Sequence, residues 1–409
     1  MSALILATSL FAFPALTDAA TGARVGDARL VMSGWYVALA PLCNTLDALS
    51  MFSGRQHFAF FATSAISYAL WRRLRLTAPV SARVRCGKET LIASLTLLSL
   101  VVLYAGGTML RRPLARLVMG SPDDVIVDFH SHTSYSWDGR RDFTPMTNRR
   151  WHRDSGFDVS YVTDHGTFDG AREGAARNPA RAGNGVVLLS GIEVRSDGRH
   201  LDILGTDASD SAAYQRDDLD EGMFVRTVRP KQSVAPLVLL TLPGHLNTEA
   251  LDVPIDAVEI SDGAPRALSQ IDDQRQRILD LARERDVALI AGSNNHGWAS
   301  ASPAWSVMEI AGWQAMTPTQ LDAAIRSTIL RRGFKAVRVI ERRSPGPVSY
   351  SALAATVPVA AWRMLTRLSW TERSAWLCWI WIGWAAVMLI RRLDRHRRMR
   401  ISNVKRSHA

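Results

Sequence analysis

Histidines and acidic residues recur at the ends of short apolar segments in the middle of the chain. The first of these segments ends in Asp128-Phe129-His130-Ser131-His132. Alternate residues of an extended strand point the same way, so His130 and His132 can converge on one metal ion. The chain has ten histidines, and six of them stand at such segment ends: His130, His132, His165, His200, His245 and His296. A single histidine there would usually be structural, but six of them with Glu193 and Asp138 predict a metal-binding site.

The elements that must position these side chains are seven short runs of apolar and β-branched residues. They read DVIVDFH, FDVSYVTDH, VVLLSGIEV, HLDILG, PLVLLTLPGH, DAVEISDG and DVALIAGSNNH, and polar segments able to form helices separate them. Near-continuous apolar strands that alternate with helices predict a parallel sheet covered on both faces. Seven such strands predict a closed or nearly closed α/β barrel, with its chemistry on loops at the C-terminal ends of the strands.

The spaced series HxH…D, TDH, GxE, H, GH and GSxxH resembles the motifs of the PHP (polymerase and histidinol phosphatase) superfamily. The resemblance extends over roughly residues 123–343. It implies a distorted seven-stranded (βα) barrel that holds up to three metal ions, flanked in this chain by transmembrane α-helices. Within the superfamily, the stretch Asn295-His296-Gly297-Trp298 is most similar to the carbaryl-hydrolase-like branch.

The resemblance also implies which residues hold the metal ions. It assigns His130 and His132 to the first ion, Glu193 as a bridge to the second, His200 and His245 to the second, and Asp138, His165 and His296 to the third. The sequence departs from the family at Asn294, where the family has an aspartate ligand. An amide oxygen can bind a metal ion but brings no negative charge, so we expect a weaker first site and two or three bound divalent ions. Nitrogen and oxygen ligands without sulfur suit Mn, Zn or Fe.

Closely spaced divalent ions would provide a metal-activated water near neutral pH and would stabilise charge on the attacked and leaving oxygens. The family precedent implies a phosphoesterase that acts on a small phosphorylated substrate. Two alternatives stay open. The same site could hydrolyse a carbamate, an amide or a carboxylic ester, or the domain could be a non-catalytic sensor of a metal ion or an anion.

Other polar residues beside the motifs are candidates for catalysis. Three arginines could hold an anionic substrate by bidentate contacts: Arg140, Arg195 and Arg199. Asp164 could orient His165 or accept a proton, or else it caps the following helix. We take Asp164 and Arg195 as the catalytic candidates. Asp262 ends the sixth run and either supports the metal site or is a turn residue, whereas His152 lies outside every motif and is interpreted as structural.

Apolar residues concentrate at the two ends of the chain. Residues 90–110 carry no charge and match the ~20 residues that a bilayer core requires of a helix. Residues 375–390 are shorter but rich in tryptophan and are followed by Arg391 and Arg392, as is typical of a membrane-interface anchor. Weaker candidate spans are 3–16, 30–49 and 58–71.

These patterns predict an order of regions along the chain. We expect a membrane region with up to four helices at 1–110, a linker at 111–122, the metallohydrolase barrel at 123–343, a linker with an interfacial helix at 344–373, a transmembrane helix at 374–392 and a basic tail at 393–409.

The net charge of +11 comes largely from basic clusters beside the apolar runs, at 71–88 and 391–406. Such clusters orient membrane spans, so the charge indicates topology and disfavours nucleic acid as a partner. Both clusters should face the cytoplasm, which predicts a multi-pass protein of the bacterial inner membrane with its barrel in the periplasm. The expected partners are the lipid bilayer and a small substrate, and no oligomeric state is predicted. All three cysteines lie outside the barrel region, so its chemistry should need no thiol.

Overall fold

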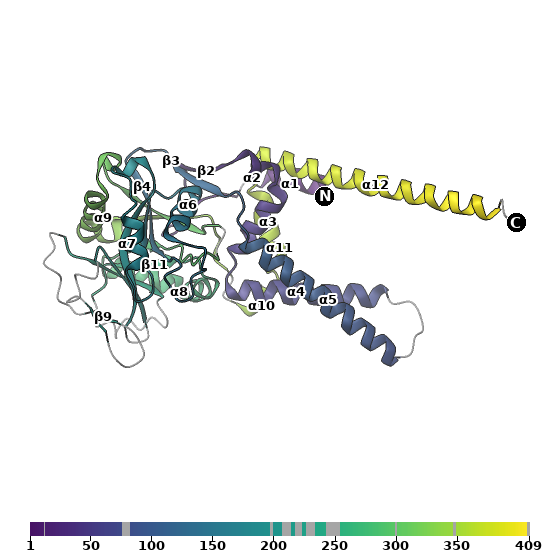
Figure 1. Ribbon diagram of the computed structural model, residues 1–409, viewed down its shortest axis with the longest axis horizontal. Coiled ribbons are helices and arrows are strands. Elements are labelled where there is room, and N and C mark those ends of the chain that lie inside the picture. The colour runs from purple at the N-terminus through teal and green to yellow at the C-terminus, as the bar shows by residue number, and fades with distance from the viewer. Residues whose placement is uncertain are drawn as a thin grey trace.

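The computed structural model shows an α/β body with two helical extensions on one side (Figure 1). It describes residues 1–409 except 12, 76–81, 197–198, 207–213, 217–222, 226–233, 243–253, 299–300, 347–348 and 407–409. The predicted ligand His245 lies outside the described residues.

The body is built on a sheet of ten strands in the order β1-β14-β13-β4-β5-β6-β7-β10-β11-β12. In chain order the strands are β1 (Thr17–Asp18), β4 (Asp124–Ser131), β5 (Val159–Val162), β6 (Val187–Ser196), β7 (Arg199–Leu204), β10 (Leu237–Leu242), β11 (Ala257–Ser261), β12 (Ala288–Ala291), β13 (Ala304–Glu309) and β14 (Arg338–Glu341). The seven predicted runs form β4 to β7 and β10 to β12, so the α/β class is confirmed. The predicted count of seven strands is wrong, because β13, β14 and β1 extend the sheet beyond β4.

The prediction of an all-parallel sheet is also wrong at its centre. The strands β4, β5 and β6 are parallel, as are β10, β11 and β12, but β7 is antiparallel to both of its neighbours, β6 and β10. The reason is the short connection between β6 and β7, which leaves no room for the crossover helix that parallel strands require. In the resulting hairpin Glu193 is paired with Asp202, and Arg195 with His200.

The sheet curls so that the chain following β12 meets β4. The backbone amide of Asn294 donates to the carbonyl oxygen of His130 at 2.8 Å, and the amide of His132 donates to that of Asn295 at 3.3 Å. An isolated parallel bridge joins Ser131 to Asn295. The strand ends that carry the predicted ligands therefore gather at one edge of a barrel-like sheet.

Helices pack against the curled sheet and fix its strands. They are α6 (Pro145–Ser155), α7 (Asp169–Ala175), α8 (Pro265–Glu284) and α9 (Pro318–Arg332). On α8 the buried residues Leu268, Ile271, Ile278 and Ala282 recur at helical spacing and form its core-facing stripe. The helix α6 begins after Thr144, whose side chain accepts from the amide of Thr147. The core lies between these helices and the sheet. Two smaller antiparallel sheets pair β2 (Ala28–Met32) with β3 (Ala115–Met119) and β8 (Tyr214–Arg216) with β9 (Met223–Val225).

The remaining helices lie on one side of the body. They are α1 (Ser2–Ala7), α2 (Gly34–Ala38), α3 (Ala40–Ser50), α4 (Gly54–Arg75), α5 (Ala82–Met109), α10 (Tyr350–Leu353), α11 (Thr356–Thr366) and α12 (Trp370–Arg406). The helices α4 and α5 run side by side, with the rings of Phe60 and Tyr104 5.0 Å apart, and α12 extends alone (Figure 1). The weaker candidate span 30–49 is wrong, because the structure divides it among β2, α2 and α3. Its Asp47 is buried in an ion-pair network instead.

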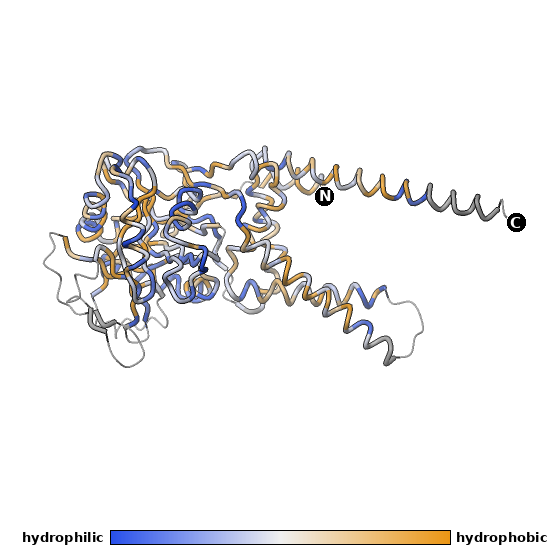
Figure 2. Tube along the Cα trace, viewed as in Figure 1, coloured by the Kyte–Doolittle hydropathy of each residue, from blue (hydrophilic) through white to orange (hydrophobic). Residues whose placement is uncertain are grey.

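Two of these helices are long and apolar enough to cross a bilayer, as judged by length and composition. They are the parts Gly87–Met109 of α5 and Trp370–Arg395 of α12, which cover residues 90–109 of the first predicted span and all of the second. The most apolar part of the first has 0% of its residues buried and that of the second 6%, unlike a core helix of a soluble domain. Hydrophobic residues run along both helices outside the α/β body (Figure 2). The helix α12 continues into the predicted basic tail as far as Arg406.

Candidate metal centre

His130 and His132 meet at the C-terminal end of β4. Both side chains are fully buried, and their Nε2 atoms lie 3.0 Å apart. The side-chain oxygen Oε2 of Glu193, on β6, lies 3.4 Å from Nε2 of His130 and 3.3 Å from Nε2 of His132. The structure thus brings together the three residues that the sequence assigned to the first metal ion and its bridge.

Glu193 also contacts two further predicted ligands. Its Oε2 lies 3.1 Å from Nδ1 of His165, and its Oε1 contacts Nδ1 of His200. Burial favours the neutral carboxyl, but contacts with His130, His132 and His200 hold the pKa of Glu193 well below its usual value. Glu193 is therefore a carboxylate at the centre of four imidazoles.

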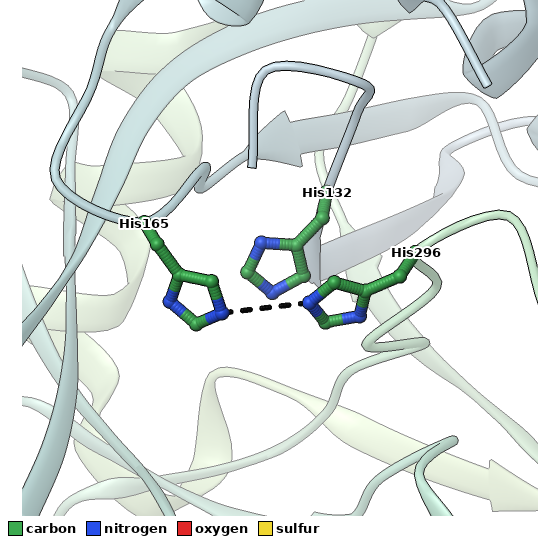
Figure 3. Close-up of side chains that lie close together, drawn as sticks. All are labelled: His132, His165 and His296. Carbon is green, nitrogen blue, oxygen red and sulfur yellow. Dashed lines mark hydrogen bonds between the residues drawn. The ribbon is translucent and has the colours of Figure 1, made fainter. Parts of the chain in front are cut away.

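A second group surrounds the exposed side of this centre. Figure 3 shows the rings of His132, His165 and His296 turned toward one another, with Nε2 of His165 3.5 Å from Nε2 of His296. The ring of His132 stacks on that of His296 with centroids 3.8 Å apart. The carboxylate oxygen Oδ1 of Asp138 lies 3.2 Å from Nε2 of His296 and 3.6 Å from Nε2 of His165. The three residues predicted for the third metal ion are thus neighbours.

Asn294 lies in the turn after β12, where it adopts a positive φ of 42°. Its side-chain amide donates to Oδ2 of Asp262 at 3.0 Å. Its buried side-chain oxygen Oδ1 has no hydrogen-bond partner within the part of the chain that the structure describes. Asp262 in turn accepts from the amide of Ala264 at 2.5 Å, so it is both a turn residue and a neighbour of the centre.

The sequence reading missed a third group behind His130. Oε1 of Glu259, on β11, lies 3.5 Å from Nδ1 of His130, and Oδ2 of Asp202, on β7, lies 3.9 Å from it. Ligand atoms of His130, Glu259 and Asp262 all lie within 4.8 Å of one another. Burial raises the pKa of Glu259 and of Asp202 well above the usual values. The sequence feature that could have identified Asp202 and Glu259 is a carboxylate in the middle of an apolar strand, in HLDIL and AVEIS.

Asp164 holds the loop that carries the site. Its Oδ1 accepts from the amide of Thr133 at 2.6 Å and from Oγ of Ser136 at 3.0 Å, and its Oδ2 accepts from Oγ1 of Thr133 at 2.7 Å. Oγ of Ser136 also lies 3.1 Å from Nδ1 of His132, so Asp164 supports that ring through one hydroxyl. The alternative that it caps the following helix is wrong, because α7 begins after Phe168 and has no side-chain cap.

The three arginines differ in their surroundings. Arg140 is paired with Asp142, with Nε 2.5 Å from Oδ1, and its NH1 donates to the carbonyl oxygen of Gly297 at 3.2 Å. Arg195 is exposed and stands two residues after Glu193 on β6, which places both on the same face of the strand. Arg199 opens β7 on the same hairpin. Arg195 is therefore the arginine best placed at the rim of the centre.

His152 has the surroundings expected of a structural residue. Its Nε2 lies 2.7 Å from Oδ2 of Asp128 and its Nδ1 lies 2.8 Å from the carbonyl oxygen of Asn148. Asp128 also accepts from the amides of His130 and Ser293 at 3.2 and 2.9 Å. The pair therefore fixes α6, β4 and the turn after β12 to one another.

The residues present fit divalent metal ions. Within the described residues, buried atoms without a hydrogen-bond partner include Nδ1 of His130, Oδ1 of Asp138, Oε2 of Glu193, Oδ1 of Asn294 and both carboxylate oxygens of Asp202 and Glu259. Buried polar atoms are normally hydrogen-bonded, so this many without a partner in one place fit the ligand set of a cation. Their nitrogen and oxygen chemistry suits Mn, Zn or Fe.

Comparison with known proteins gives distant likenesses. No protein-family model and no curated protein matches the chain. Among solved structures, PsfC from Pseudomonas syringae is 15% identical, with a TM-score of 0.37 over 60% of this chain and 99% of its own. A two-domain protein from Bacteroides vulgatus that contains a predicted PHP-like metal-dependent phosphoesterase is 13% identical, with a TM-score of 0.30 over 51% of this chain and 64% of its own. An amidohydrolase from Chromobacterium violaceum is 13% identical, with a TM-score of 0.27 over 53% of this chain and 98% of its own. Likenesses at this level define neither a family nor a reaction.

Proposed function

We propose that this chain is a metal-dependent phosphoesterase. The observation that supports the proposal is the position of Glu193, whose two carboxylate oxygens contact ring nitrogens of His130, His132, His165 and His200. Imidazole nitrogens and carboxylate oxygens that meet at one buried point are ligands that suit divalent ions such as Zn, Mn and Fe.

In this proposal two sets of residues would hold divalent ions. The inner set is His130, His132, Glu193, His200 and Asn294, and the outer set is Asp138, His165 and His296. Bound ions would supply Lewis acidity to a phosphoryl oxygen and lower the pKa of a water molecule. Asp164 would keep the loop of His132 in place through Thr133 and Ser136, and Arg195 would hold the anionic group of the substrate.

We further infer that α5 and α12 anchor the body to a membrane. Their apolar parts are almost wholly exposed, and basic residues adjoin the start of α5 and the end of the apolar part of α12. The positive-inside rule then puts both basic ends in the cytoplasm and the α/β body on the outer side, in the periplasm of a bacterium.

The function is tested by phosphate release from monoesters and diesters. The full-length chain in detergent is assayed with Mn²⁺ or Zn²⁺ and with a chelator, beside the variants His130→Ala and Glu193→Gln. The variant His57→Ala serves as the control, because His57 lies on α4 and contacts Tyr104 rather than the centre. We expect metal-dependent turnover that is lost in His130→Ala and Glu193→Gln and kept in His57→Ala. A folded, metal-loaded protein without release would contradict the proposal, and carbamates, amides and carboxylic esters would be tried next.

A further inference from the structure

A cavity of about 650 Å³ lies where the α/β body meets the helices, away from the metal centre. Its walls come from β2, α3, the segment after β14, α11 and the start of α12. Figure 1 shows α3 and α11 between the body and the extended helices. The cavity therefore lies beside the start of α12, one of the two apolar helices.

One part of the wall is apolar. It includes Met32, Phe52, Val359, Met364 and Leu368. These side chains come from segments far apart in the sequence, so the apolar surface exists only in the folded chain. A wall of this kind suits hydrocarbon, such as an acyl chain.

The rest of the wall carries an excess of positive charge. It contains Arg24, Arg29, Arg342, Arg343, Arg363 and Arg367, against the acidic residues Asp47 and Glu372. Arg342 is paired with Asp47 at 2.7 Å, and Arg343 is paired with Asp272. Within the described residues no ion pair is made by Arg24, Arg29, Arg363 or Arg367.

Arg363 and Arg367 are one helical turn apart at the end of α11. Like charges at this spacing repel, so an anion bound between them would be favoured. NH1 of Arg367 donates to the carbonyl oxygen of Arg342 at 2.9 Å and NH2 to Oγ of Ser344 at 2.7 Å, which orients the guanidinium without neutralising it. Its buried Nε has no partner among the described residues. Burial and the charges of Arg363 and Arg342 lower the pKa of Arg367 to about 10.

We propose that this cavity binds an amphiphile with a phosphate headgroup, such as an anionic phospholipid. Arg363 and Arg367 hold the phosphate through charge-assisted hydrogen bonds, and the acyl chain lies along the apolar wall. The exposed rings of Trp362 and Trp370, which flank the two arginines in the sequence, are of the kind that lies at the headgroup level of a bilayer. The proposal concerns a site separate from the metal centre and does not depend on catalysis there.

Thermal unfolding of the full-length chain in a neutral detergent tests the proposal. Short-chain phosphatidic acid, phosphatidylcholine of the same chain length and inorganic phosphate are each titrated, and the shift in Tm gives an apparent Kd. We expect phosphatidic acid to raise Tm and the double variant Arg363→Gln/Arg367→Gln to weaken this binding by about tenfold or more. The conservative variant Arg363→Lys/Arg367→Lys should retain part of it, because charge remains but the fork-shaped donor is lost.

The control is Arg331→Gln/Arg332→Gln, which removes two exposed arginines from the end of α9, outside the cavity. A second probe is Ala360→Phe, which fills the cavity without changing its charge. We expect the control to bind as the unaltered chain does, and Ala360→Phe to lose the amphiphile. Equal shifts in Tm with phosphatidic acid and inorganic phosphate would overturn the assignment of an amphiphile. An equal loss of binding in the Arg331/Arg332 control would mean that net charge alone explains the effect, which would overturn the site. Unchanged binding in the Arg363/Arg367 variant and in Ala360→Phe would overturn the site itself.

Discussion

The carboxylate of Asp47, on α3, lies 2.7 Å from NH1 of Arg342, just after β14, and ties the helical segment to the α/β body. NH2 of Arg112, after α5, lies 2.6 Å from the same carboxylate, and the hydroxyl of Tyr36 donates to it at 2.8 Å. Asp47 is 1% exposed, so the network is shielded from water. Asp47 therefore links α3 and the chain after α5 to the α/β body.

Replacing Asp47 by Ala should strongly destabilise the protein. The change leaves Arg112 and Arg342 buried without their carboxylate, which typically lowers the free energy of unfolding by about 3–5 kcal/mol. Denaturant unfolding followed by tryptophan fluorescence measures the loss. The matched control is Asp27→Ala, which breaks an exposed ion pair with Arg338 and should cost less than about 1 kcal/mol. Equal effects of the two changes would contradict the assigned role of the network.

Replacing Glu259 by Gln should weaken metal binding, although Glu259 is a proposed ligand in neither the inner nor the outer set. Glu259 faces Nδ1 of His130 and would orient the imidazole, and loss of such a partner typically costs about 10–100-fold in metal affinity. Elemental analysis after dialysis and the metal-induced rise in Tm are the readouts. The control is Glu309→Gln on β13, where the side chain is exposed. Unchanged metal affinity in Glu259→Gln would remove Glu259 from the centre.

Replacing Asn294 by Asp should strengthen metal binding and weaken the metal-free protein. The new carboxylate would add a negative charge to the centre, but without metal it would stand against Asp262 in place of the present 3.0 Å amide hydrogen bond. We expect a lower Tm after chelation and a larger rise when metal is restored. Asn184→Asp, an exposed change, controls for charge. Metal stoichiometry and affinity equal to those of the unaltered chain would count against this role.

The stability of the protein should fall as the pH rises through the titration of Asp158. Burial raises the pKa of Asp158 from 3.8 to about 6, so the folded state holds this proton more tightly than the unfolded state. Its contribution is complete below about pH 4, decreases up to about pH 6 and is constant above that. Asp158→Asn should remove this slope while still accepting from the amide of Ile126, and Asp154→Asn, at an exposed site, should keep it. Parallel curves of unfolding free energy against pH for Asp158→Asn and the unaltered chain would refute the assignment.

The proposed orientation predicts a cytoplasmic C-terminal end. A reporter that fluoresces only in the cytoplasm should be active when fused after Ala409. The same reporter inserted beside the exposed Asn184, in the α/β body, should be inactive. The reverse pattern would place the body in the cytoplasm and overturn the topology.

The sequence predicted which side chains lie together where an apolar strand was followed directly by its candidate metal-binding residues. His130 and His132 fall at alternate positions of a long apolar run, and the period of the strand alone predicts that they share a face. The runs that became β4 to β7 and β10 to β12 were likewise long enough to be recognised. The two residues of β1 are too short to show a period.

The features of the site that the sequence did not predict are contacts between segments far apart in the chain. Glu259 and Asp202 each stand out as a carboxylate within an apolar strand, but only the curl of the sheet brings them to Nδ1 of His130. Asp164 follows its strand as a ligand might, but its oxygens are occupied by Thr133 and Ser136, which lie 31 and 28 residues away. Such contacts are set by tertiary packing rather than by local pattern.

The β6–β7 hairpin restricts insertions at this point of the chain to even numbers of residues. His200 and Asp202 stand on one face of β7, opposite Arg195 and Glu193. A shift of β7 by one residue would turn that whole face outward and remove both side chains from the centre at once, while Glu193 stayed in place. A shift by two residues would keep the face but move each side chain one pair along. An insertion that shifts the pairing of β7 therefore keeps His200 and Asp202 on the inner face only when it has an even number of residues.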